Sequence, residues 1–158
     1  MIFIRDERKC LIRKYVKKLM ILIMEIECKI LGELDRPNAN GRVYPKAEMQ
    51  KAIKDYLNSW RHYGELNPNY GELSHNVSLS NISHEIKDIN IVGEDVICKI
   101  ELLDTPRGKI AKDIIKAGQD LKFALRIIAQ VEPIKKGPGK HTGETRLKNM
   151  QIISIDII

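Results

Sequence analysis

Short apolar runs rich in isoleucine, separated by turns containing Gly, Pro, Asn or Asp, dominate this sequence and constrain its fold most strongly. Runs of this length and composition predict β-strands. We expect strands at Leu22–Leu34, Val77–Ile89, Asp95–Leu103, Leu121–Val131 and Met150–Ile158. Within Leu121–Val131, residues two apart share a face, so Ala124 and Arg126 are predicted to lie side by side.

Two segments instead have the spacing of buried helix faces. Pro45 opens the first helix, expected to end near Arg61, with its apolar stripe at Met49, Ala52, Ile53, Tyr56, Leu57 and Trp60. Thr105 and Pro106 start the second as N-cap and first residue, and Gly118 ends it. Its stripe is predicted at Ile110, Ala111, Ile114 and Ile115.

Polar Gly-, Pro- and Asn-containing loops are expected at Arg36–Pro45, Gly64–Gly71 and Lys135–Arg146, and no internal repeat is evident. At 158 residues the chain is large enough for one domain with a substantial core. Strands predominate with two helices inserted. We therefore expect an α+β domain built on a barrel or a strongly bent antiparallel sheet.

Positive charge is concentrated at the beginning of the chain. Met1–Met20 holds seven basic and two acidic residues, so it carries most of the net charge of +6. We divide the chain into a basic N-terminal arm or propeptide, residues 1–21, and a domain, residues 22–158. A processed propeptide, a helix and a start codon assigned too far upstream all remain open for the arm.

Several function classes are disfavoured by composition. The body is nearly neutral and aromatic residues are few, so nucleic-acid binding is an unfavoured alternative that would use the arm. The apolar stretch Leu19–Ile23 is too short for a membrane span. Cys10, Cys28 and Cys98 lack metal-ligand spacing, so we expect no metal and no cofactor.

Three segments, in order, resemble the prohead core proteases of tailed bacteriophages. The first runs from Asn40 to Pro45, Asn-Gly-Arg-Val-Tyr-Pro, and leads into the first helix. The second is Gly71-Glu72-Leu73-Ser74-His75. The third begins at Leu103-Asp104-Thr105-Pro106-Arg107-Gly108-Lys109 and continues to the strand Phe123-Ala124-Leu125-Arg126.

This resemblance implies a fold similar to that of herpesvirus assembly proteases, an antiparallel β-barrel flanked by helices. It implies a serine endopeptidase that cleaves scaffold and capsid proteins during prohead maturation. The expected location is the inside of the prohead in the host cytoplasm. We also expect a homo-oligomer without membrane association.

Ala124 departs from the family pattern, because the resemblance implies a nucleophilic serine at this position. A methyl group cannot attack a carbonyl carbon, so no acyl-enzyme can form on it. We favour a Ser-to-Ala change that silences a self-cleaving protease. The alternative is a natural pseudoprotease that binds scaffold during capsid assembly.

The remaining site residues follow from the same resemblance. His75 is expected to be the general base, or otherwise an ordinary loop histidine. Asp156 is our first choice for its orienting partner, and its alternative is a solvated strand-end carboxylate. His84 is the alternative third member, or otherwise a surface histidine.

Arg126 is expected to hold the oxyanion or a substrate carboxylate, and an ordinary sheet-edge arginine is the alternative. The resemblance also implies cleavage after a glutamate that follows an aliphatic residue by two positions. Ile23-Met24-Glu25 and Leu31-Gly32-Glu33 fit this pattern. Cleavage after Glu25 would release the basic arm.

Overall fold

A computed structural model describes residues 2–9, 24–60, 62–68, 76–135, 137–138 and 141–158, with only the backbone given for residues 2–9 and 141. Its elements, in chain order, are β1 Ile2–Lys9, β2 Met24–Leu31, β3 Arg42–Val43, α1 Lys46–Leu57, β4 Tyr63–Glu65, the 3₁₀ turn η2 Leu79–Asn81, β5 Ile82–Val92, β6 Asp95–Leu102, α2 Pro106–Lys116, β7 Lys122–Lys135 and β8 His141–Ile157. The predicted mixed α+β class, mostly strands with two helices, is confirmed.

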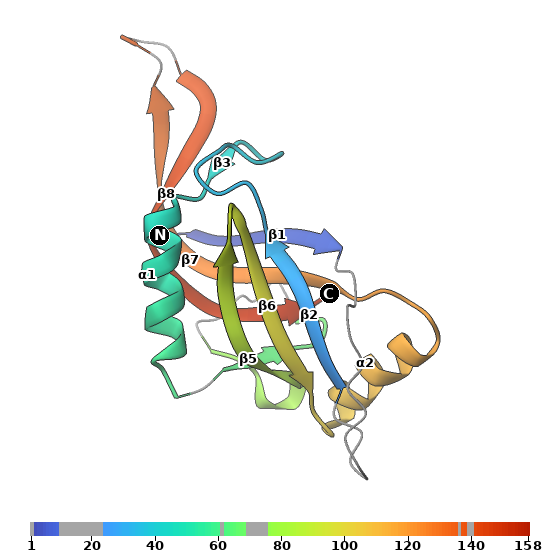
Figure 1. Ribbon diagram of the computed structural model, residues 1–158. Helices are drawn as coiled ribbons and strands as arrows, with labels where there is room; N and C mark the ends of the chain where they lie inside the picture. The colour runs from blue at the N-terminus through green and yellow to red at the C-terminus, as the bar shows by residue number, and fades with distance from the viewer. Residues whose placement is uncertain (1, 10–23, 61, 69–75, 136, 139–140) are drawn as a thin grey trace.

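The described strands form two four-stranded sheets, in the orders β1-β7-β8-β3 and β2-β6-β5-β4 (Figure 1). The predicted closed barrel is not found among them. The sheets meet where β4 approaches β8, through a parallel bridge between Leu66 and Ile157. β4 pairs with β5, and Leu66, the residue after β4, forms an isolated bridge with β8 in place of a continuous ladder.

The core lies between these sheets and is closed by the helices. Buried residues of α1 are Met49, Ala52, Ile53 and Tyr56, as the periodicity predicts. Trp60 is 83% exposed, contrary to the prediction, because α1 ends at Leu57 and places it beyond the helix. In the described part of the chain, no helix is both long and apolar enough to cross a membrane.

α2 begins and ends where the sequence predicts. The Thr105 side chain accepts a hydrogen bond from the Gly108 backbone N–H at 3.0 Å, which caps the first turn. Gly118 follows the helix with φ +76°, a conformation favoured by glycine. Ala111 and Ile115 are buried, whereas Ile110, expected in the same stripe, is 45% exposed.

The loop predicted at Lys135–Arg146 is largely strand. β7 and β8 pair as far as Lys135 and His141, so their ends form a two-stranded ribbon that projects from the body (Figure 1). The N-terminal arm also contains a strand, since β1 pairs antiparallel with β7. A helix is therefore the wrong description for residues 2–9, and residues 10–23 lie outside the described part.

Candidate active site

The pairing of β7 with β8 brings several predicted site residues together. Ala124 lies directly opposite Asp156, and Arg126 lies opposite Ser154. Opposite residues of an antiparallel pair share a face, and so do residues two apart in one strand. All four side chains therefore lie on one face of the β7–β8 pair, and each is at most 3% exposed.

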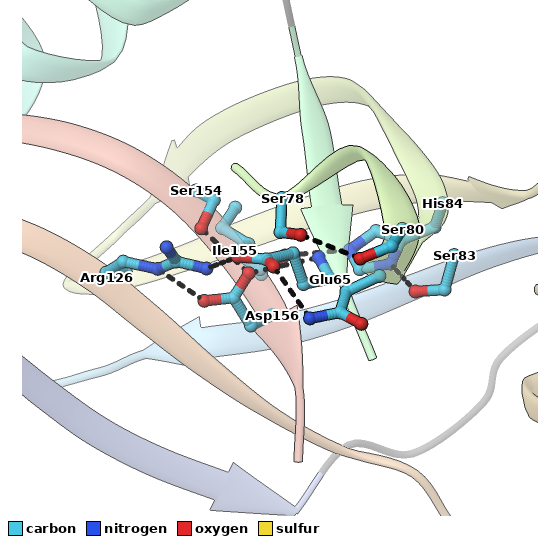
Figure 2. Close-up of polar contacts among 10 residues, drawn as sticks. Glu65, Ser78, Ser80, Ser83, His84, Arg126, Ser154, Ile155 and Asp156 are labelled. Carbon is cyan, nitrogen blue, oxygen red and sulfur yellow. Dashed lines mark hydrogen bonds and ion pairs between the residues drawn. The ribbon is translucent and has the colours of Figure 1, made fainter. Parts of the chain in front are cut away.

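Arg126 and Asp156 form the centre of a buried polar cluster (Figure 2). Arg126 Nε donates to Asp156 Oδ2 at 2.8 Å, and Arg126 Nη2 donates to Glu65 Oε2. Asp156 Oδ1 accepts from Ser154 Oγ at 2.8 Å and from the Glu65 backbone N–H at 3.1 Å. Arg126 is thus neither an exposed nor a sheet-edge arginine, and Asp156 is not solvated.

The charges of this cluster do not cancel. Glu65 and Asp156 supply two carboxylates against one guanidinium, and all three side chains are buried. Burial alone lowers the pKa of Arg126, but its hydrogen bonds and charge attraction to Asp156 and Glu65 outweigh this effect and raise it. Arg126 therefore stays positively charged, and the cluster carries a formal surplus of one negative charge.

Glu65 is a member of this cluster that sequence reasoning missed, since we expected a loop at its position. Its Oε1 also accepts from Asn81 Nδ2 at 3.3 Å. A signal was present: Tyr-Gly-Glu-Leu occurs at Tyr63–Leu66 and again at residues 70–73. The first occurrence supplies Tyr63–Glu65, which form β4.

His84 lies apart from this cluster, in the interior, and is not a surface histidine. It is 0% exposed, and its ring meets Phe123 edge-on with centroids 6.2 Å apart. Its Nε2 lies 2.7 Å from the Ile155 carbonyl oxygen, and its Nδ1 lies 2.8 Å from Ser83 Oγ. A carbonyl only accepts, so Nε2 carries the proton and Nδ1 accepts from Ser83.

Gly64 allows this close packing of β4 against His84. A Cβ atom at Gly64 would lie 2.1 Å from His84 Nε2 and 2.1 Å from the Ile155 carbonyl oxygen. A residue with a side chain therefore cannot replace Gly64 without displacing His84 or the Ile155 backbone. His84 thereby links β5 to the residue that precedes Asp156.

The stability of the protein should depend on pH through His84. Burial lowers the pKa of His84 from 6.5 to about 4. The unfolded chain therefore binds a proton over this interval when the folded chain does not, and stability falls as pH drops from about 6.5 towards 4.

We expect His84 to account for a loss of about 2 kcal/mol between pH 6.5 and 5, measured by urea unfolding. His84→Gln should lack this part of the loss, whereas a control His62→Gln should keep it. An equal pH dependence in all three proteins would contradict the assignment.

Tyr56 has a buried hydroxyl without a hydrogen-bond partner among the described residues. Burial first, and then the nearby Cys98 and Asp156, raise its pKa. We expect Tyr56→Phe to stabilise the protein by about 1 kcal/mol in urea unfolding, because it removes an unsatisfied polar group. Tyr63→Phe, at an exposed position, should change stability little. A loss of stability in Tyr56→Phe would show that the hydroxyl has a bonded partner.

His75 and Glu72 lie outside the described residues. The described residues on either side of segment 69–75 contact the cluster region: the Asn67 backbone N–H donates to the Ile157 carbonyl at 2.6 Å, and Asn81 contacts Glu65. Asn67 and Asn81, which precede and follow the undescribed segment in sequence, therefore both lie beside the cluster. The described residues contain no group of three or more His, Cys, Asp or Glu side chains that could hold a metal ion.

Comparison with known proteins places the chain in a family. The profile described as prohead core protein serine protease matches residues 17–139, most of the sequence. This chain belongs to that family. Its fold is similar to the structure of the bacteriophage T4 capsid assembly protease, gp21, with a TM-score of 0.80, 23% identity, and coverage of 98% of this chain and 95% of the T4 chain. No curated protein sequence matches it.

Proposed function

We propose that this family member is built as a serine endopeptidase that cleaves scaffold and capsid proteins inside the phage prohead. We further propose that position 124 is its nucleophile position. The observation that carries the proposal is the direct pairing of Ala124 with Asp156 on β7 and β8. The similar T4 protein is a capsid assembly protease.

In the proposed mechanism a serine at position 124 would attack the scissile carbonyl. His75 would take the hydroxyl proton and return it to the leaving amine. Asp156 would orient His75. Its oxygens already accept three hydrogen bonds, of the roughly four that a carboxylate can accept, so one site remains for an imidazole. The surplus negative charge of the cluster would stabilise the imidazolium.

Arg126 fits a positioning role better than direct contact with substrate. Its Nε and Nη2 are bonded to Asp156 and Glu65. The two Nη1 protons and the second Nη2 proton remain for the oxyanion role that the resemblance implies. Arg126 would act chiefly by holding the Asp156 carboxylate in place beneath position 124.

A second candidate function is that of a non-catalytic assembly protein on the same fold, binding scaffold as part of a homo-oligomer. Two observations favour it. Residue 124 is an alanine, and the polar groups beneath it are bonded to one another without any hydroxyl at that position. On this view Ala124 is natural rather than an inactivating change.

The experiment that separates the two is the Ala124→Ser variant incubated with purified scaffold and capsid proteins. Cleavage into defined fragments, detected by intact mass, supports the endopeptidase. Uncleaved substrates together with an unchanged fold support the assembly protein.

Self-cleavage after Glu25 can be read from the same sample by N-terminal sequencing, which should give a new terminus at Ile26. Glu25 lies within β2, opposite Glu101 of β6. The bond is therefore held in a paired strand, and cleavage requires local opening of β2. An intact N-terminus in an otherwise active variant would contradict release of the arm at this site.

A further inference from the structure

The sequence Tyr-Gly-Glu-Leu occupies a restrictive position between the two sheets, at Tyr63–Leu66. We call the surroundings that hold these four residues the β4 site. At the second residue this site accepts only glycine without a rearrangement. A Cβ atom on Gly64 would lie 2.1 Å from His84 Nε2 and 2.1 Å from the Ile155 carbonyl oxygen.

The third and fourth residues of the β4 site are held just as closely. The Glu65 side chain is bonded to Arg126, and its backbone N–H donates to Asp156 at 3.1 Å (Figure 2). Leu66 is 7% exposed, and its backbone N–H donates to the Asn81 carbonyl at 3.0 Å. A segment that fills the site must therefore offer glycine, glutamate and an apolar residue in this order.

A second segment of the chain meets these requirements. Tyr-Gly-Glu-Leu recurs at residues 70–73. Because the two copies are identical, the second can make every contact that the first makes in the β4 site. Gly32–Leu34 also reads Gly-Glu-Leu, but it is fixed after β2, where the Leu34 backbone N–H donates to the Glu94 carbonyl at 3.0 Å.

The chain is long enough for the second copy to reach the site. The β4 site lies between the end of α1 at Leu57 and the start of β5 at Ile82. With residues 70–73 in the site, residues 58–69 would lead to it from α1 and residues 74–81 would connect it to β5. Hairpin connections commonly need only about two to five residues, so both connections are sufficient.

The residues that follow the two copies differ. Asn67 and Pro68 follow the first copy, whereas Ser74 and His75 follow the second. The Asn67 backbone N–H donates at 2.6 Å to the carbonyl of the β8 residue that comes directly after Asp156. Exchange of the copies therefore puts an imidazole in the place of the buried Pro68 ring, beside the carboxylate.

The same flanking residues favour the first copy as the usual occupant. Asn67 has φ +50°, a left-handed conformation that asparagine adopts more readily than serine. In the exchanged state Ser74 would have to take this conformation. Since the contacts of the four repeated residues are the same in both states, flanking residues of this kind set the balance between them.

We propose that Tyr63–Leu66 and residues 70–73 are alternative occupants of the β4 site, and that their exchange brings His75 beside Asp156. With the first copy bound, the point after the site holds Pro68, which has no titratable group. With the second copy bound, it holds a base. The exchange needs neither serine nor substrate and so goes beyond the proposed function, while its effect on His75 rests on that function.

Cysteine trapping tests which copy occupies the site. Tyr63 lies directly opposite Glu85 of β5. In a Cys10→Ser background, Tyr63→Cys/Glu85→Cys reports the first copy and Tyr70→Cys/Glu85→Cys reports the second, because a disulfide requires this close approach. Oxidised glutathione is the oxidant, and the cross-linked peptides are identified by mass. Gly71→Ala added to the second pair is the matched control, since it blocks docking and leaves random collision unchanged.

Both pairs should form disulfides, and the second should form at least about tenfold faster than its Gly71→Ala control, because docking raises the effective concentration of the two thiols. Cross-linking of the second pair at the rate of its control, beside complete cross-linking of the first, overturns the proposal.

A stability cycle tests the exchange without added cysteines. Gly64→Ala excludes the first copy and leaves the β4 site to the second, so the protein should still fold. Gly71→Ala alone should change the urea midpoint little. Gly64→Ala/Gly71→Ala should lower the midpoint by clearly more than the two single changes together, because no occupant remains. Additive effects, or a Gly64→Ala protein that does not fold, would show that the second copy is no substitute.

The Ala124→Ser variant separates this inference from the proposed function. Cleavage that persists with the disulfide at Tyr70→Cys/Glu85→Cys, and is lost with the one at Tyr63→Cys/Glu85→Cys, supports both. Exchange detected by trapping in a protein that never cleaves leaves the alternative occupants standing and removes the endopeptidase. Cleavage that is indifferent to both disulfides overturns the placement of His75 by exchange.

Discussion

Ala124→Ser is expected to raise the rate of scaffold cleavage by about 10³-fold or more over the parent chain, since loss of a catalytic serine costs up to about 10⁶ in kcat. The hydroxyl would stand directly opposite Asp156, in a site whose other polar groups are already in place. The measurement is the initial rate of cleavage of a purified scaffold protein, with product masses determined.

Two controls make this result specific. Ala129→Ser places the same hydroxyl at another buried alanine of β7 and should give no activity. Ala124→Ser/His75→Ala should return the rate to the parent level, because no base would remain to activate the serine. A folded Ala124→Ser protein with no cleavage would rule out the endopeptidase and leave the assembly protein.

Arg126→Met should destabilise the protein by about 3–5 kcal/mol, the usual result of removing one partner from a buried ion pair. The substitution leaves Asp156 and Glu65 buried next to each other with no positive charge between them. Chemical unfolding followed by circular dichroism measures the change. Arg126→Met/Glu65→Gln should recover part of the loss, since it removes one of the two carboxylates.

Arg36→Met is the matched control for this experiment. Arg36 pairs with Glu94 at the surface, with side chains 61% and 55% exposed. Exposed pairs contribute about 1 kcal/mol or less, so this variant should lose little stability. Equal losses of stability in Arg36→Met and Arg126→Met would mean that the buried cluster contributes no more to stability than an exposed ion pair.

Local sequence patterns were sufficient to predict much of the architecture. Helix α2 could be predicted closely, because a threonine cap, a proline at the first position and a terminal glycine are all encoded within a few residues. The core face of α1 followed from its periodicity for the same reason. Trp60 was misplaced because no glycine or proline follows Leu57 closely enough to mark the end of α1.

The candidate site was predictable only in part. Ala124, Arg126 and Asp156 could be named because their segments resemble the prohead core proteases, and an acid within an apolar strand also stands out at position 156. Their arrangement in space could not be predicted, because three register shifts interrupt the pairing of β7 with β8 and the sequence does not reveal them. His84 was expected at the surface because its partner, the Ile155 carbonyl, lies far from it in sequence and no nearby residue indicates that contact.

By itself, the sequence determined the mixed class, the two helices and which residues stand at the proposed nucleophile position and beside it. The tertiary structure decided that Glu65 joins Arg126 and Asp156, that the described strands form two sheets instead of a closed barrel, and that Ile2–Lys9 covers the edge of β7. The physical reason is the distance along the sequence over which each kind of interaction acts. Caps, turns and periodicity act over a few residues, whereas strand pairing and buried charge depend on which distant segments the whole core brings together.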